Sequence, residues 1–211
     1  MRQWITIPGR ASAWLWPLVA LACLFVPRGA AAQVGTYDID PRYATISFGV
    51  KAFGLMHPQG SFPQFQAHLS IDFTNPHASV MRVVVDDSDI DMSMPGAADM
   101  LRSTDYFDSA HHPTITFRST AVTQLSPGHI AVQGVLTIRG VDHAENLDLL
   151  VTPVAGTTPP IADFSAKATI NRSDFGMDAN RTFLSNQITL IIHSRLQLPA
   201  QPQIESASAS K

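Results

Sequence analysis

The sequence predicts an all-β protein, on the basis of three observations. Apolar and polar residues alternate along most of the chain, which is the spacing of strands that bury one face. Turn-forming stretches such as Ser126-Pro127-Gly128 separate these segments. Only Gly96–Arg102 has the spacing of a helix, and it is short. Roughly seven to nine strands in such an order are typical of an antiparallel sandwich or a closed barrel.

The individual strands can be read from the period of two. The clearest alternating segments are residues 67–73, 130–138, 147–151, 164–170 and 188–196. Several alternating runs extend over about ten or more residues, which exceeds the usual strand length. Small residues such as Gly134 and Ala166 interrupt the bulky ones on the faces that should point inward. The length of the strands and the space left by small inward-facing residues together favour a barrel that encloses a ligand. An eight-stranded barrel is wide enough for one small ligand.

The N-terminus has the features of an export signal. Arg2 and Arg10 precede an apolar run, Ala13–Val26, and a small-residue Ala-Ala-Ala sequence follows it. We therefore expect residues 1–32 to be a signal peptide cleaved after Ala32, residues 33–199 to form the barrel domain and residues 200–211 to be a flexible tail. This organisation predicts a periplasmic or secreted protein with no stable membrane span after signal cleavage, since the run is too short to be a typical span.

Composition excludes several classes of function. The single cysteine, Cys23, lies in the signal segment, so cleavage leaves no disulfide, no thiolate metal ligand and no cysteine nucleophile. Lipidation of Cys23 is an alternative, but Ala20 stands where a lipoprotein signal prefers Leu. The formal net charge is −3, and without a basic stripe nucleic acid is not expected as a partner.

Four motifs carry a resemblance to a known family. They are Gly60-x-Phe62-x-x-Phe65, the block 101–120 (LRSTDYFDSAHHPTITFRST), the block 134–141 (GVLTIRGV) and the block 170–178 (INRSDFGMD). In this order they resemble the YceI-like family of secreted and periplasmic polyisoprenoid-binding proteins, over about Thr36–Leu198. The resemblance implies a lipocalin-like, eight-stranded antiparallel β-barrel with one short helix near the opening. It also implies an apolar interior that holds an isoprenoid lipid or a quinone tail, with no cofactor and no known catalytic residues.

The alternation then assigns residues to the interior and to the rim. The apolar tunnel is predicted to be lined by Phe48, Val50, Phe65, Leu69, Ile71, Ile115, Phe117, Leu136, Leu149 and Ile192. The candidates for contacting a ligand head group at the rim are Arg102, Arg118, Arg139 and His112. An arginine can hold a phosphate with two parallel hydrogen bonds. The alternative for these arginines is pairing with Asp105 or Asp108.

The sequence does not predict a metal site. His111 and His112 lie beside Asp105 and Asp108, but adjacent residues of an extended chain point to opposite sides. The acidic run at residues 86–91 lacks the spacing of a calcium loop. Three methionines lie close together in the sequence: Met92, Met94 and Met100. Their thioether groups could bind copper(I). The alternative is that these flexible side chains pack the short helix against a deformable barrel opening.

The sequence therefore favours a non-catalytic lipid-binding protein. An enzyme that acts on a lipid-like substrate with His112 and Asp105 at the rim is an alternative, and a ligand-free stress or interaction protein is another. Bulky substitutions at Gly134 or Ala166 should be tolerated by a roomy tunnel and should destabilise a filled barrel. Homodimer formation is left open by the sequence.

Overall fold

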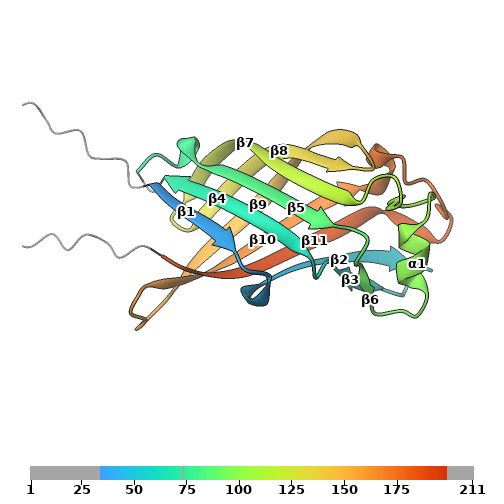
Figure 1. Ribbon diagram of the computed structural model, residues 1–211, viewed down its shortest axis with the longest axis horizontal. Coiled ribbons are helices and arrows are strands. Elements are labelled where there is room, and N and C mark those ends of the chain that lie inside the picture. Colours follow the sequence, from blue (N-terminus) through green and yellow to red (C-terminus); the bar gives the residue numbers. More distant parts are fainter. Residues whose placement is uncertain (1–33, 73, 199–211) are drawn as a thin grey trace, which may run out of the picture. The chain divides into compact units, whose positions relative to one another are not determined.

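The computed structural model describes residues 34–72 and 74–198, and strands make up most of them (Figure 1). The predicted signal peptide and the predicted tail from residue 200 onward lie outside the described residues. Eleven strands belong to one antiparallel sheet. They are β1 (Val34–Ile39), β2 (Ala44–Ala52), β3 (Gln59–Ser61), β4 (Phe65–Asp72), β5 (Val80–Asp86), β6 (Asp91–Met92), β7 (Thr114–Ser126), β8 (His129–Ile138), β9 (Val141–Val154), β10 (Ile161–Asn171) and β11 (Leu184–Gln197).

The helices are few and short, as the sequence predicts. The helices are α1 (Ala97–Arg102) and the 3₁₀ turns η1 (Pro41–Tyr43), η2 (Pro76–Ala78) and η3 (Arg172–Phe175). Gly96 precedes α1 with φ of 73°, a left-handed conformation that glycine adopts without steric cost. No helix in the two described ranges has the length and apolar character needed to cross a bilayer.

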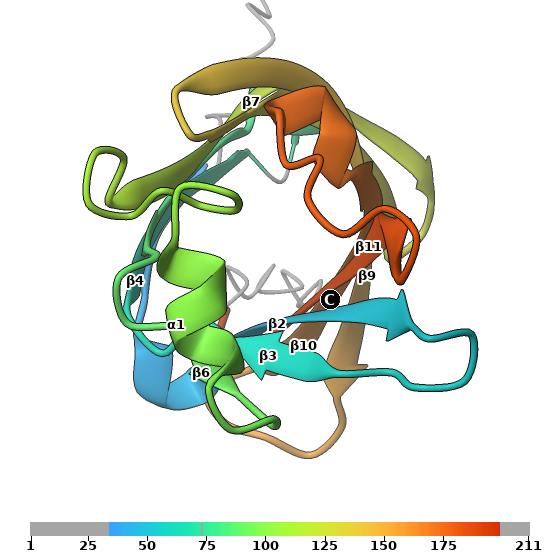
Figure 2. The ribbon, with the colours of Figure 1, turned by 90° about the vertical axis from the view of Figure 1, so that its right-hand side faces the viewer.

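The sheet curls into a ring that contains eight strand paths. Seven strands form a continuous ladder in the order β4-β5-β7-β8-β9-β10-β11. β1 pairs with β4 at one end of this ladder, and β2 pairs with β11 at the other. Because β1 and β2 follow each other in the chain, they act as one strand broken at η1. Figure 2 shows the resulting ring viewed from the α1 end. The all-β barrel predicted from the sequence is confirmed.

Prolines interrupt the chain at points where the barrel strands are divided into shorter segments. Pro41 begins η1, and its missing N–H cannot take part in a ladder. Pro63 likewise separates β3 from β4. The short strands β3 and β6 extend the sheet beyond β2 at the α1 end. The barrel is therefore widened by extra strands at the same end at which α1 lies (Figure 2).

The interior is apolar along its whole length. On β10 and β8, alternate residues such as Phe164, Ala166 and Leu136 are buried, while intervening ones such as Lys167 and Gln133 are exposed. Aromatic rings contact one another at the α1 end: Phe62 lies between Phe48 and Phe107, at centroid distances of 5.0 and 6.0 Å. The hydrophobic effect of this burial is the main force that holds the barrel together, since the described residues contain no disulfide.

Candidate functional site

A cavity of about 430 Å³ occupies the interior at the α1 end of the barrel. Its walls come from β2, β5 and β7 to β11, and α1 with the neighbouring loops covers its opening. Among the described residues that line it, only Tyr106, Glu145, Arg172 and Asn180 carry a polar side chain. The volume lies in the range of small-molecule sites, and the lining suits an apolar ligand.

The tunnel residues predicted from the sequence divide into three groups by depth. Six of them line the main cavity: Phe48, Val50, Ile115, Phe117, Leu136 and Ile192. Phe65, Leu69 and Leu149, together with Ile192, line a second, smaller cavity of about 70 Å³. Ile71 lines neither cavity and packs against the core. The period of two thus identifies the inward face, whereas the position of open space along the strand depends on packing.

Flexible and aromatic side chains surround the opening. Phe53 and Phe183 stack with ring centroids 5.3 Å apart, and the Phe53 N–H donates to the Phe183 carbonyl over 2.8 Å. Both rings line the cavity, and both are more than half exposed. The methionines that the sequence analysis singled out, Met92, Met94 and Met100, also line the cavity. Their packing there fits the deformable opening proposed from sequence.

None of the four rim candidates lines the cavity. Two of them, Arg139 and His112, lie near the same carboxylate, that of Asp108. The hydrogen bond with His111 lowers the pKa of Asp108 most, and the charges of these two candidates contribute to the lowering. Arg102 pairs with Asp99 and donates to the Ser88 carbonyl. Arg139 donates to the Gly176 carbonyl over 2.9 Å.

The other two rim candidates also have local neighbours. Arg118 is exposed on β7 opposite Arg82, beside the inward Phe117, and the His112 ring packs near Gly140. A head-group role for the four rim candidates stays a prediction.

The structure reveals a polar group at the cavity that sequence reasoning missed. Arg172, at the start of η3, is 3% exposed and lines the cavity. Its guanidinium donates three hydrogen bonds to backbone carbonyls, those of Ser185 (3.1 Å), Met177 (2.5 Å) and Leu184 (3.4 Å). The signal that would have found it is its place in the block 170–178, where a charged residue directly follows a buried strand.

Tyr106 and Asn180 complete this polar group. Asn180 Nδ2 donates to the Tyr106 hydroxyl oxygen over 2.7 Å, and both residues line the cavity. Tyr106 comes from the loop between α1 and β7, and Asn180 from the loop between η3 and β11. Two loops that are far apart in sequence therefore meet beside Arg172 at the opening.

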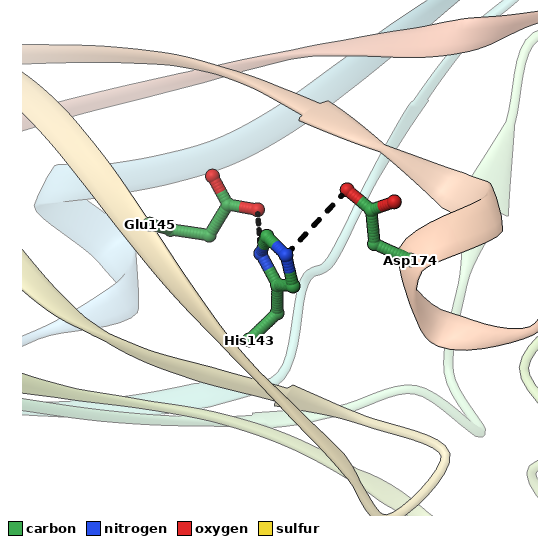
Figure 3. A group of neighbouring side chains, drawn as sticks. All are labelled: His143, Glu145 and Asp174. Atoms are coloured by element: carbon green, nitrogen blue, oxygen red, sulfur yellow. Dashed lines mark hydrogen bonds and ion pairs between the residues drawn. The ribbon is translucent and has the colours of Figure 1, made fainter.

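A second polar group lies on β9 and η3 (Figure 3). His143 Nδ1 is 3.1 Å from Glu145 Oε1, and His143 Nε2 is 3.7 Å from Asp174 Oδ2. These three residues offer donor atoms within 4.8 Å of one another, as a divalent ion requires. The two carboxylates, however, approach different ring nitrogens. That arrangement suits an imidazole bridging two carboxylates better than a metal centre, in which one nitrogen and both carboxylates must face the same ion.

Glu145 connects this second group to the cavity. Its carboxyl is largely buried and lines the cavity wall. Burial raises the pKa of Glu145, and the hydrogen bond with His143 opposes the rise. His143 also packs edge-on against the buried ring of Phe175, 5.8 Å away. Glu145 is thus the acidic member of the described cavity lining, and His143 is its hydrogen-bond partner.

The histidine pair at residues 111 and 112 does not form a shared site. His111 Nδ1 lies 2.8 Å from Asp108 Oδ1, and this contact lowers the pKa of Asp108 and raises the pKa of His111. The His112 ring packs beside Gly140 instead. The two rings therefore face different surroundings, as the sequence analysis expects of neighbouring residues.

The fold and cavity define a class: a β-barrel with an apolar internal compartment. The YceI-like domain matches residues 37–196 of this chain. A UPF0312 protein of Vibrio cholerae is 31% identical over 154 residues, covering 70% of this chain and 80% of that protein. A UPF0312 protein of Pectobacterium carotovorum is 29% identical over 181 residues, covering 84% of this chain and 93% of that protein. The chain belongs to the YceI-like family, which confirms the resemblance seen in its motifs.

Solved structures share the fold. Burkholderia cenocepacia BcnA superposes with a TM-score of 0.68 at 20% identity, covering 75% of this chain and 99% of that one. A polyisoprenoid binding domain from Saccharophagus degradans superposes with a TM-score of 0.58 at 13% identity, covering 80% of this chain and 99% of that one. The Campylobacter jejuni YCEI protein superposes with a TM-score of 0.59 at 23% identity, covering 66% of this chain and 84% of that one. At these identities the likeness concerns the fold.

Proposed function

We propose that this protein binds a long apolar lipid of the isoprenoid type inside the barrel and carries it without chemical change. The observation that carries the proposal is the apolar cavity of about 430 Å³, whose lining contains four polar side chains among the described residues. Membership of the YceI-like family supports it. So does the fold that the chain shares with a domain named as polyisoprenoid binding.

The energetics of transfer from water support an isoprenoid ligand. Burying one CH₂ group contributes about 0.8 kcal/mol, so a five-carbon unit contributes roughly 4 kcal/mol. Association and ordering costs offset part of this gain. Several units in succession therefore give useful affinity without specific polar contacts, which fits a lining made mostly of Ile, Leu, Val, Phe and Met side chains.

The chemistry of the lining supports a non-catalytic role. The described residues that line the cavity include no Ser, Thr, Cys or His, which are common nucleophiles and general bases; the carboxyl among them, Glu145, is hydrogen-bonded to His143. His112 and Asp105, the residues considered for an enzyme, do not line it. A carried lipid requires enclosure and release, and neither of these needs such groups.

The export signal predicted for residues 1–32 supports a periplasmic or secreted location. N-terminal sequencing of the protein from the bacterial envelope fraction tests this part, and we expect the mature chain to begin at Gln33. Recovery of the protein only from the cytoplasm with residues 1–32 intact would contradict it.

The central experiment is extraction and mass spectrometry of lipid from protein purified from its native source, followed by titration with a prenylquinone. We expect a prenyl lipid in near-stoichiometric amount and saturable binding of the added quinone. Protein that releases no lipid and binds no prenylquinone would overturn the proposal.

A further inference from the structure

Among the described residues that line the cavity, one is a cation, and its surroundings are unusual for an arginine. Arg172 is 3% exposed, and its three hydrogen bonds all go to neutral carbonyl oxygens. No carboxylate of the described residues forms an ion pair with it; the nearby Asp178 pairs with Arg181 instead. Since a guanidinium has five N–H groups, two remain without an acceptor among the described residues.

The hydroxyl of Tyr106 likewise has a donor hydrogen without an acceptor among the described residues. It accepts a hydrogen bond from Asn180 Nδ2, so its own hydrogen points elsewhere, and the described residues offer it no acceptor. Tyr106 is 3% exposed and lies close enough to Arg172 to influence the pKa of the guanidinium. Burial lowers the pKa of Arg172, yet an arginine stays charged in a protein. One positive charge and one hydroxyl donor thus remain at the wall of an apolar compartment.

We infer that Arg172, Tyr106 and Asn180 form a head-group subsite. This subsite selects lipids with an anionic, oxygen-rich head group, such as a prenyl phosphate, over lipids with a neutral head group. The inference rests on the proposed function. A buried charge without an ionic partner is costly, and an oxyanion would supply the missing partner. Charge-assisted hydrogen bonds from a guanidinium to such a group are short and strong.

The position of the subsite gives the ligand a direction. Tyr106 and Asn180 come from loops at the α1 end, where the cavity opens. The apolar wall continues from there to residues such as Leu136, Leu147 and Ile192. The head therefore lies at the opening and the tail extends inward. Glu145, the carboxyl among the described lining residues, is hydrogen-bonded to His143.

The test compares three probes: geranylgeranyl phosphate, geranylgeraniol and inorganic phosphate alone. Titration of the lipid-stripped wild-type protein should show at least a tenfold preference for the phosphate ester over the alcohol. Inorganic phosphate should bind far more weakly, because it lacks the tail. Equal binding of ester and alcohol would overturn the inference and leave the proposed function intact. Failure of both lipids to bind would overturn the proposed function itself.

Variants separate recognition from structural support, since Arg172 also bonds to the loop around Met177 and Leu184. Arg172→Gln should lose the preference for the ester about 10- to 100-fold while its affinity for the alcohol is unchanged. Arg195→Gln is the matched control, because it removes an exposed arginine of β11 that pairs with Asp163 and does not line the cavity. It should keep the preference.

A second variant covers the case in which Arg172→Gln fails to fold. Tyr106→Phe keeps the ring and removes only the hydroxyl, and it should reduce ester binding about threefold to tenfold with alcohol binding unchanged. Parallel loss of both lipids in the folded variants, or no loss of ester binding in either variant, would assign Arg172 and Tyr106 to structure alone.

Discussion

Asp87 is a fully buried carboxylate that follows β5, and its electrostatics predict an unusual pH dependence of stability. Its exposed fraction is 0%, and neither carboxylate oxygen has a hydrogen-bond partner among the described residues. Its backbone N–H donates to the Pro113 carbonyl over 3.1 Å, which holds the residue inside. Burial raises the pKa of Asp87 from 3.8 to about 6; the neighbouring Ser109 hydroxyl and the charge of His112 oppose the rise, and the like charge of Asp86 adds to it. Asp87 therefore favours its protonated form in the folded protein.

The sign and size of the effect follow from this shift. Since the folded-state pKa lies above the unfolded value, the stabilisation is fully present below pH 3.8 and is lost as the pH rises through about 6. A shift of about 2 units corresponds to up to about 3 kcal/mol. Asp87→Asn removes this titration and keeps the shape of the protonated side chain. The variant should therefore gain up to about 3 kcal/mol relative to wild type between about pH 4 and pH 8.

Urea denaturation of both proteins at several pH values measures this gain. Asp72 and Asp108, whose hydrogen bonds lower their pKa values, make both proteins less stable in acid. Their contribution cancels in the difference between variant and wild type. Asp89→Asn, at an exposed position two residues on, controls for the loss of one negative charge. A difference between Asp87→Asn and wild type that stays constant across the pH range would refute the reasoning.

Three further predictions concern packing. Ala168→Phe places a ring in the main cavity and should reduce bound lipid at least tenfold in an extraction assay; unchanged lipid content would argue against binding there. Gly134→Ala should destabilise the fold by about 1–3 kcal/mol, because an added Cβ would lie 2.3 Å from the Phe117 ring and 2.7 Å from the Arg118 carbonyl oxygen; thermal melts check this, and an unchanged melting temperature contradicts it. Phe175→Ala, at a ring that is 1% exposed, should cost about 3–5 kcal/mol in urea denaturation, and a cost below 1 kcal/mol would contradict that packing.

Gly134 shows how far alternation alone can predict the interior. The sequence places it on an inward face, where a bulky substitution should be tolerated by a roomy tunnel and should destabilise a filled barrel. The Phe117 ring of the neighbouring strand already covers the glycine, so destabilisation by a larger side chain at Gly134 would not distinguish the two. Which ring covers which glycine depends on strand register, and register is not visible in a single strand's pattern.

The polar lining shows a limit of another kind. The sequence predicts Arg102, Arg118 and Arg139 as rim candidates because they are the positive charges concentrated near the predicted rim, and none of them lines the cavity. Arg172 is not among those candidates. Three carbonyls from the chain around β11 and the preceding loop converge on its buried side chain. Such convergence is a property of tertiary structure, and the local sequence shows only a charged residue directly after a buried strand.

The segment Asp105–His112 is rich in charged groups, and its geometry shows why those groups do not line the cavity. The chain turns sharply here, with Asp108 at φ of 52°, and backbone N–H groups of His111 and His112 both donate to the Asp108 carbonyl. This turn separates the side chains: Asp108 engages His111 away from the cavity, while Tyr106 and Phe107 line it. The aromatic residues of the segment therefore face the cavity, and backbone hydrogen bonds together with the Asp108–His111 contact hold the turn beside them.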